Sequence, residues 1–320
     1  MKAPRTRVIT IATILLAVAA LAGGLTALLR PPGAAGRPAQ GGGERVDLAR
    51  SVADYTGRFG PDQAFLPPGR ADREDIAEAI GLLLDGHRDR AERRLAQRDF
   101  TVRTLVDRAF GHRYAEVADR TDTAVTPRGW GRVYVDLEHR PSWSVQVPHP
   151  VSDRGTEQLG VRVLRGSPGG VLVIAGAHRK SGSDDSADVA HRRDTVFHAI
   201  CAELARRGMP GIQLHGFAAS SAPGYDVIAS TGAGSEGRQE GRELADRLRG
   251  RDFRVCRAWV RSCPLEGRTN LQGRVADAED VSFLHVEFSP EVRAGGRATA
   301  RAADAVAGIT RAWADTPVPD

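Results

Sequence analysis

The spacing of apolar positions divides the chain into stretches of different character. Residues 8–29 are uncharged and rich in Ile, Leu, Val and Ala. Residues 46–98 place apolar side chains at helical spacing, as in Ile76, Ile80 and Leu83, and are otherwise strongly charged. This periodicity predicts a helical segment with no evident chemistry of its own.

From about residue 100 onward, short β-branched runs alternate with amphipathic stretches, which predicts an α/β domain over residues 99–320. The expected sheet is mostly parallel or mixed and doubly wound, with flanking helices and with ligands at the carboxyl ends of its strands. Residues 171–175 and 282–288 are apolar enough for central strands that are covered on both faces. The expected strands are 132–137, 143–147, 160–164, 171–175, 211–214, 226–230, 254–259 and 282–288, and the expected helices are 194–207, 236–249 and 290–313.

The N-terminal stretch has the features of an export signal. Lys2, Arg5 and Arg7 precede the 22 uncharged residues 8–29. That length can span the roughly 30 Å apolar core of a bilayer. Positive charge before the span predicts that the rest of the chain is translocated. We therefore expect residues 1–30 to be a signal anchor that holds the protein in the membrane, or else a cleaved signal peptide.

The segment that follows is expected to be a tether. Residues 31–45 are rich in Pro, Gly and Ala and contain few large apolar side chains. Such a composition is typical of a flexible linker. Together with the N-terminal signal, it predicts a domain on the extracellular side of the cell membrane, or a secreted one.

The charge balance argues against a nucleic-acid partner. The chain has a net charge of +5, and three of its positive charges belong to Lys2, Arg5 and Arg7. In the remainder, Arg alternates with Asp and Glu, and no aromatic residues interleave with them. This pattern is typical of a solvated surface.

The three cysteines exclude a thiolate zinc site, because they form no Cys-x-x-Cys pair. Cys201 falls on the apolar side of an expected helix and is predicted to be a core residue. Cys256 and Cys263 are close enough in sequence to form a disulfide, which would persist outside the cell.

Histidines at the ends of expected strands are the main functional signal. His149, His178 and His215 each lie at or just past a strand end, so a parallel sheet would bring them to one edge. Asp153 follows His149, and the segment from His178 onward also contains Asp188 and His191. Three N/O ligands with an open fourth position are typical of catalytic zinc, which activates water and polarises a carbonyl. The pattern predicts a site for one Zn²⁺ ion.

Glu287 lies inside the apolar run 282–288, where a carboxylate is costly unless it is paired or functional. One interpretation is a general base beside the metal. The alternative is a glutamate that faces solvent through the alternation of a strand, on the same face as Phe283 and His285.

Several short motifs occur in an order that resembles a known family. They are His149–Glu157 (HPVSDRGTE), Leu214–Gly216 (LHG), Thr231–Gly232 (TG), Thr269–Arg274 (TNLQGR) and His285–Arg293 (HVEFSPEVR). This order resembles that of the phage-type poly-γ-glutamate hydrolases, which are compact relatives of the zinc carboxypeptidases. The resemblance covers roughly residues 145–295.

The resemblance implies roles for particular residues. His149 and His215 would be zinc ligands, and Glu287 would be the general base. Asp153 stands where the family has a glutamate ligand, at a spacing one residue shorter, so Glu157 stays open as the third ligand. Arg274 or Arg293 would bind a substrate carboxylate or support the structure. The segment with His178, Asp188 and His191 has no counterpart in the family and would supply additional ligands or site residues.

The resulting hypothesis is an exported, zinc-dependent amidohydrolase or peptidase-like enzyme for carboxylate-rich substrates such as poly-γ-glutamate or cell-wall peptides. One alternative is a serine hydrolase, because Ala233–Gly237 is a near match to a nucleophile elbow around Ser235, and Asp252 or Asp280 and then His285 follow it. Another is a non-catalytic extracellular binding module on a hydrolase fold.

Overall fold

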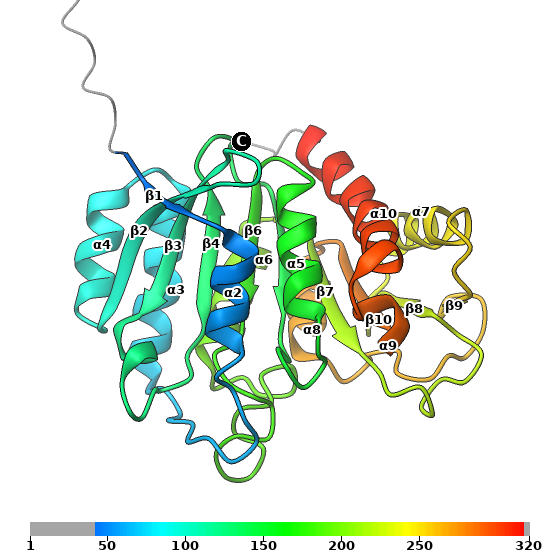
Figure 1. Cartoon of the computed structure of the whole chain (residues 1–320), viewed down its shortest axis with the longest axis horizontal. Helices are drawn as coiled ribbons and strands as arrows, with labels where there is room; N and C mark the ends of the chain where they lie inside the picture. Colours follow the sequence, from blue (N-terminus) through cyan, green and yellow to red (C-terminus); the bar gives the residue numbers. More distant parts are fainter. Residues whose placement is uncertain (1–41, 317–320) are drawn as a thin grey trace, which may run out of the picture. The chain divides into compact units, whose positions relative to one another are not determined.

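A mixed sheet with helices on both faces forms the body of the protein (Figure 1). The computed structural model describes residues 42–316. The predicted α/β class with a mixed sheet and flanking helices is confirmed. Between residues 42 and 316, no helix has the length and apolar character needed to cross a membrane. The apolar segment predicted to be a signal anchor, residues 8–29, lies outside the described residues.

The described strands form one sheet of ten strands. In their order across the sheet they are β1 (Glu44–Val46), β2 (Phe100–Asp107), β3 (Arg113–Asp119), β4 (Arg132–Asp136), β6 (Gly170–Ile174), β5 (Trp143–Val147), β7 (Gly211–Gly216), β10 (Phe283–Phe288), β8 (Val227–Ser230) and β9 (Val255–Arg257).

The centre of this sheet is parallel, and its flanks are partly antiparallel. Strands β6, β5, β7 and β10 run in the same direction. Strand β4 pairs antiparallel with β6, and β8 pairs antiparallel with β10. The carboxyl ends of the four central strands therefore meet at one edge, where ligands bind in open α/β sheets.

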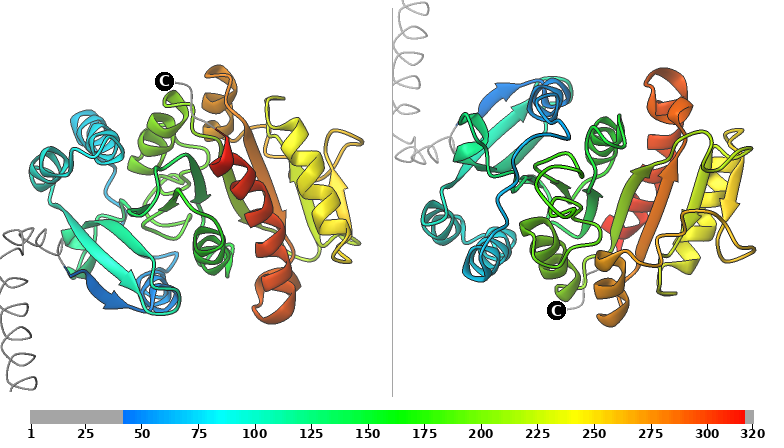
Figure 2. Two further views of the ribbon diagram at one scale, coloured as in Figure 1. Left: turned by 90° about the horizontal axis from the view of Figure 1, so that it is seen from above. Right: turned by 90° about the horizontal axis from the view of Figure 1, so that it is seen from below.

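Helices form a layer on each face of the sheet, as the two views of Figure 2 show. One layer holds the helices that pack with the apolar cluster around Val171 and Val173, and the other holds those that pack with the cluster around Val145 and Leu214. The first layer comprises α3 (Arg70–Leu84), α4 (Arg88–Ala96), α6 (Val196–Arg206) and α8 (Leu271–Ala278), and the second comprises α2 (Leu48–Thr56), α5 (Thr156–Arg165), α7 (Arg238–Arg249) and α10 (Gly296–Asp315). The short α9 (Pro290–Arg293) connects β10 to α10, and one 3₁₀ turn, η1 (Arg120–Thr123), follows β3.

The central strands differ between their two faces. On β7, Ile212 and Leu214 point into the apolar cluster beneath α5 and α10. The alternate residues, Gln213 and His215, are equally buried but point to the other face. This alternation places a layer of polar side chains inside the protein, and the candidate site includes His215 from that layer.

Two predicted elements differ from the structure, one in its type and one in its extent. Residues 160–164, predicted as a strand, belong to α5. Within these five residues, the β-branched Val161 and Val163 alternate with Arg162, which matches the period of a strand. The helical spacing shows only over the full span Thr156–Arg165. The predicted helix 290–313 is interrupted at Gly295, whose φ of 94° lies in the left-handed region, and is divided into α9 and α10.

Strands β2 and β3 were not predicted, because charged residues interrupt their apolar runs. One of these, Glu116 on β3, has a fully buried side chain. It accepts hydrogen bonds from Arg103, from Arg132 at 3.2 Å and from the Tyr134 hydroxyl at 3.1 Å. Arg132 also pairs with the buried carboxylate of Asp122 at 2.8 Å, so Glu116 is one of two acidic residues that balance this charge.

We predict that Glu116→Ala lowers the free energy of unfolding by about 1–3 kcal/mol, because Arg132 and the Tyr134 hydroxyl each lose a buried hydrogen-bond acceptor, while Asp122 still pairs with Arg132 at 2.8 Å. Urea unfolding followed by circular dichroism measures the change. The matched control is Glu92→Ala, which removes a surface ion pair with Arg88 at 2.6 Å and should cost less than about 1 kcal/mol. Equal losses in the two variants would contradict the prediction.

Candidate metal centre

Two parallel strands and the loop after one of them bring three predicted ligands together. His149 lies two residues past the end of β5, and Asp153 lies in the loop that leads to α5. His215 lies near the end of β7, the direct neighbour of β5 in the sheet. All three side chains are buried, and one potential ligand atom from each lies within 4.8 Å of the others.

The three groups face one another through specific atoms. Nδ1 of His149 lies 3.3 Å from Oδ2 of Asp153, and Nδ1 of His215 lies 3.5 Å from the same oxygen. The backbone N–H of Gly216 also donates to Asp153 Oδ2, at 3.1 Å. The point between these atoms is therefore surrounded by two imidazole nitrogens and one carboxylate oxygen.

The opposite nitrogen of each imidazole is engaged with an acceptor. His149 Nε2 lies 2.7 Å from Oδ1 of Asp188, and His215 Nε2 lies 2.7 Å from Oε1 of Gln213. Both Nε2 atoms must therefore carry the proton. In neutral imidazoles this leaves both Nδ1 atoms as lone-pair acceptors that point at a carboxylate. Where both rings are neutral, three acceptors converge here, and either a metal cation or a proton between them relieves the repulsion.

The donor set suits zinc. Imidazole nitrogen and carboxylate oxygen are common zinc ligands, with bond lengths of roughly 2.0–2.2 Å. Atoms at such distances from one ion in a tetrahedral arrangement lie about 3.3–3.5 Å apart. The two separations between Nδ1 and Asp153 Oδ2, 3.3 and 3.5 Å, match this spacing. His149, Asp153 and His215 can therefore hold one metal ion.

The pKa values reflect the same electrostatics. Burial opposes the ionisation of Asp153, but hydrogen bonds with His149 and His215 outweigh it and lower its pKa. Burial also opposes the protonation of His149, yet its bonds to Asp153 and Asp188 raise its pKa. Burial and the neighbouring His285 lower the pKa of His215 to about 4. The carboxylates of Asp153 and Asp188 therefore favour positive charge near His149, whereas the His215 ring is neutral.

Glu287 lies beside His215. It is paired with His215 in the register of the parallel strands β10 and β7, so the two side chains are neighbours on one face of the sheet. The side chain is buried, and its Oε1 lies 3.3 Å from Nε2 of His285. The His285 ring in turn lies 4.3 Å from the ring of His215, measured between centroids. The alternative of a solvent-facing glutamate does not describe this residue.

A buried layer of amides supports the site and was missed in the sequence. Gln213 accepts from His215 Nε2–H and from Asn270 Nδ2, and it donates to Gln146 at 3.1 Å and to Gln272 at 3.3 Å. These bonds fix the orientation of the Gln213 amide and hence the tautomer of His215. The signal was present in the alternation of polar residues along strands otherwise made of Val, Ile and Leu.

The other expected ligands lie around the three-residue cluster rather than in it. Asp188 joins through His149, and its Oδ2 also accepts from Arg179 at 2.6 Å. His191 is exposed and contacts Asp188 at 3.1 Å. His178 is only partly buried, and its Nδ1 accepts from the backbone of Lys180 at 3.2 Å. Glu157 accepts from the Gly155 N–H at the start of α5, with both oxygens at 3.2 Å.

The two arginines are placed differently from each other. Arg293 donates to the carbonyls of Phe288 at 2.9 Å, Arg154 at 2.5 Å and Phe217 at 3.0 Å. It therefore ties together the loops that follow β10, β5 and β7, which is a supporting role. Arg274 is exposed on α8, and its Nε donates to the Arg268 carbonyl at 3.2 Å.

A disulfide joins Cys256 and Cys263, and Cys201 is buried and free. The disulfide lies at the start of the loop that carries Gly267. This glycine has a φ of +67°, and a Cβ at that position would lie 2.5 Å from the His285 ring. The loop thus presses its backbone against the histidine that contacts Glu287.

Ser235 lies in the loop between β8 and α7. Among the described residues, no hydrogen bond joins its hydroxyl to a histidine. Seven residues separate Ser230, the last of β8, from Arg238, the first of α7, whereas a nucleophile elbow needs a tight turn from strand to helix. No geometric observation favours the serine hydrolase.

The chain was compared with known proteins. No family model matches it, and no curated protein sequence matches it either. Its structure is similar to that of a bacteriophage poly-gamma-glutamate hydrolase, with 13% identity, 61% of this chain and 94% of the other covered, and a TM-score of 0.43. It is also similar to a metallo-carboxypeptidase from Burkholderia cenocepacia, with 14% identity, coverages of 74% and 68%, and a TM-score of 0.36.

A third similar structure is the succinylglutamate desuccinylase from Chromobacterium violaceum, with 14% identity, 71% of this chain and 77% of the other covered, and a TM-score of 0.35. The family that the sequence motifs resemble is thus also represented among the similar structures. With TM-scores below 0.5, these similarities do not assign an activity to this chain.

We predict that Asp188→Ala weakens zinc binding about 10–100-fold, because His149 then loses the carboxylate that orients its ring. Competition with a chelator measures the affinity. The matched control is His191→Ala, which removes another partner of Asp188 without touching a ligand and should change the affinity less than threefold. An Asp188→Ala protein that binds zinc as tightly as the unchanged protein would contradict this role.

The loop between His149 and Asp153 is strained at Val151, whose φ is 67°. A β-branched residue in this region costs about 1–3 kcal/mol. Glycine removes that strain but adds about 0.5–1 kcal/mol of backbone entropy cost. We predict that Val151→Gly raises the thermal midpoint and also weakens zinc binding, since the loop becomes less rigid. Calorimetry tests the first effect, and a lowered midpoint would refute it.

Proposed function

We propose that the domain is a zinc-dependent hydrolase of amide bonds, an amidohydrolase or peptidase. The observation that carries the proposal is the convergence of the Nδ1 atoms of His149 and His215 on the carboxylate of Asp153, with the buried carboxylate of Glu287 beside His215. A site of this kind supplies a cation and a base at the carboxyl edge of a parallel strand pair, which is where α/β folds bind their ligands.

Zinc in this position would polarise a carbonyl and make water more acidic. The protein residues would divide the remaining work. Glu287 would accept a proton from the attacking water as the new C–O bond forms, and would deliver it to the leaving nitrogen as the C–N bond breaks. Asp188 and Gln213 would hold the two ligand histidines in the tautomer that leaves Nδ1 free. His285 would fix the Glu287 carboxylate.

The proposed substrates are carboxylate-rich amides such as poly-γ-glutamate or cell-wall peptides. The resemblance of the motifs between residues 145 and 295 to the poly-γ-glutamate hydrolases supports this class. The proposed location is the extracellular side of the membrane, or the medium. The uncharged segment 8–29 behind Lys2, Arg5 and Arg7 supports export, and so does the disulfide between Cys256 and Cys263, because disulfides persist in oxidising compartments.

The test compares three variants of the purified protein. We expect about one zinc ion per chain in the unchanged protein and in Glu287→Gln, and a loss of zinc in His149→Ala and His215→Ala. Glu287→Gln should reduce cleavage of poly-γ-glutamate or peptidoglycan peptides at least about 10²-fold, since a general base commonly contributes 10²–10⁴-fold. Metal analysis and product detection measure the two effects.

Three other outcomes would contradict parts of the proposal. Full amidase activity in Glu287→Gln would refute its role as the base. Bound zinc without turnover of any amide would indicate a binding module. Metal-independent activity with labelling of Ser235 by a fluorophosphonate would replace the proposal with a serine hydrolase.

A further inference from the structure

Asn270 is the only asparagine in the chain, and it lies close to the candidate metal centre. The residue is 2% exposed and precedes α8, where its Oδ1 accepts from the backbone N–H of Gly273 at 2.9 Å. Its Nδ2 donates to Oε1 of Gln213. The same oxygen accepts from His215 Nε2–H at 2.7 Å. One side chain therefore connects the start of a helix to the amide that holds a candidate ligand.

Capping of α8 does not by itself require an asparagine. Asp and Ser cap helices about as well as Asn, and α2 and α6 have Asp47 and Thr195 as their caps. Asp and Asn have nearly the same size, but only Asn offers a donor beside its acceptor oxygen. In Asn270 that donor is bonded to Gln213. The donor is therefore the property that distinguishes Asn270 from an acidic cap.

Two backbone groups fix the orientation of the amides around Gln213. A backbone N–H only donates, so the atom of Asn270 that faces Gly273 must be the oxygen, and its nitrogen must face Gln213. A backbone carbonyl only accepts, so the atom of Gln272 that lies 2.9 Å from the Val189 carbonyl must be Nε2. Gln272 Oε1 is then the acceptor of Gln213 Nε2, at 3.3 Å. Gln213 thus meets a donor on one side and an acceptor on the other.

Gln213 satisfies these neighbours in one orientation of its amide. Its side chain is fully buried. Its Oε1 accepts from Asn270 and His215, and its Nε2 donates to Gln146 at 3.1 Å and to Gln272. An amide turned over would oppose donor to donor and acceptor to acceptor, and would leave buried polar groups without partners. His215 Nε2 therefore faces an oxygen and carries the proton of the neutral ring.

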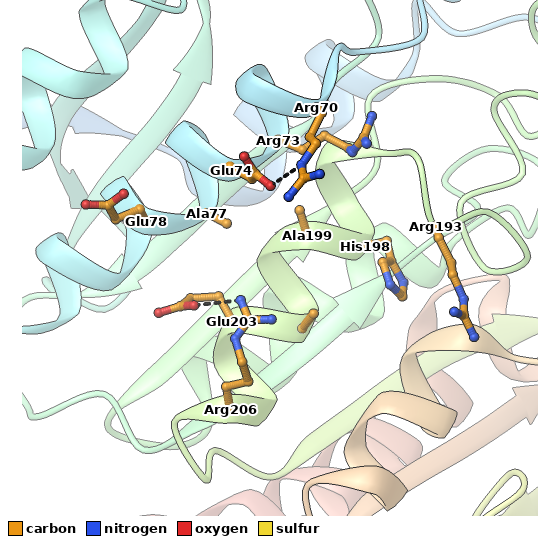
Figure 3. A pocket seen from close by; sticks show the side chains of 11 residues that line it. Arg70, Arg73, Glu74, Ala77, Glu78, Arg193, His198, Ala199, Glu203 and Arg206 are labelled. Carbon is orange, nitrogen blue, oxygen red and sulfur yellow. Dashed lines mark hydrogen bonds and ion pairs between the residues drawn. The ribbon is translucent and has the colours of Figure 1, made fainter.

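The chain of amides ends at the groove between α3 and α6 that Figure 3 shows. His198, on α6, lines this groove, and its Nδ1 accepts from Gln272 Nε2 at 3.0 Å. Burial and the nearby arginines lower the pKa of His198 to about 4, so the ring is neutral and can accept at Nδ1. The Val189 carbonyl and His198 therefore favour the same orientation of the Gln272 amide.

We propose that Asn270 is a positioning residue for metal binding. Through Gln213 it holds His215 in the tautomer whose Nδ1 lone pair is available to a metal ion. Asn270 itself would touch neither the metal nor the substrate. This role rests on metal binding by His149, Asp153 and His215, the first part of the proposed function, and not on amide hydrolysis.

A role as a helix cap alone predicts a different result for Asn270→Asp. Aspartate has the size of asparagine, caps a helix equally well and is favoured by the positive end of the α8 dipole. It presents only acceptor oxygens, so an oxygen of residue 270 would oppose Gln213 Oε1. The Gln213 amide would then turn over, and the proton of His215 would move from Nε2 to Nδ1, the atom that faces Asp153.

Competition with a chelator on the purified full-length protein measures the affinity for zinc. We expect Asn270→Asp to bind zinc at least about tenfold more weakly than the unchanged protein. The matched control is Asp47→Ala, which removes the N-cap of α2 in the opposite helix layer. It should lower the thermal midpoint but change the zinc affinity less than about threefold. An unchanged affinity in Asn270→Asp would overturn the proposal, and so would an equal loss in Asp47→Ala.

The tautomer of His215 is measured by nuclear magnetic resonance of the zinc-free protein with nitrogen-15-labelled histidine at neutral pH. The signal of His215 is assigned by its absence in His215→Ala. We expect the proton on Nε2 in the unchanged protein and on Nδ1 in Asn270→Asp. A proton on the same nitrogen in both proteins would overturn the proposal even if zinc binding were weaker, because the loss would then have another structural cause.

Asn270→Ser is a second variant for the case that Asn270→Asp does not fold. Serine keeps the cap without a charge, and its shorter side chain leaves Gln213 without this donor. It should weaken zinc binding at least about threefold, and an unchanged affinity would contradict the role of Asn270. An unchanged protein that binds no zinc would refute the proposed function, whereas the tautomers would still test the role of Asn270.

Discussion

The repulsion among three acceptors at the edge of the sheet constrains the rest of the structure. The Nδ1 atoms of His149 and His215 point at Asp153 because their Nε2 protons are given to Asp188 and Gln213. A metal cation or a proton between the acceptors relieves this repulsion, and buried groups hold the two rings in place. Much of the polar interior near β5, β7 and β10 serves that purpose.

Buried side-chain amides accommodate the polar residues of the candidate site in the protein core. The strands β5, β7 and β10 place Val, Ile, Leu and Phe under α5 and α10, and place Gln146, Gln213, His215, His285 and Glu287 on the other face. A buried amide is costly unless it is bonded, and here each Gln is bonded to another side chain. The helices α6 and α8 close this layer with His198 and Gln272. The same layer extends from the candidate metal centre to α6 and α8.

Strands with strong apolar character were predictable, because 171–175 is uniformly apolar, 282–288 places Phe283, Leu284, Val286 and Phe288 in a short run, and the two stretches fall where β6 and β10 are found. The element over residues 160–164 was not, since Val161, Arg162 and Val163 alternate like a strand over a window shorter than the helix. His149 and His215 could be identified because each follows or ends an apolar strand. Asp188 could be named as a candidate but not assigned, because it reaches His149 across 39 positions through a fold that local spacing does not describe. Gln213 and Gln146 were missed because their alternation with apolar residues is also what a strand with one solvent-facing side shows.

By itself, the sequence determined the α/β class, the export-like N-terminus and the list of residues that bear metal-binding chemistry, because these depend on composition and on periodicity along the chain. The tertiary structure decided which of these residues meet. It placed β5 beside β7, so that His149 and His215 share one carboxylate, and it left His178, His191 and Glu157 outside that cluster. The physical reason is that strand order in a sheet is set by packing between distant segments, whereas local patterns report only on the segment that carries them.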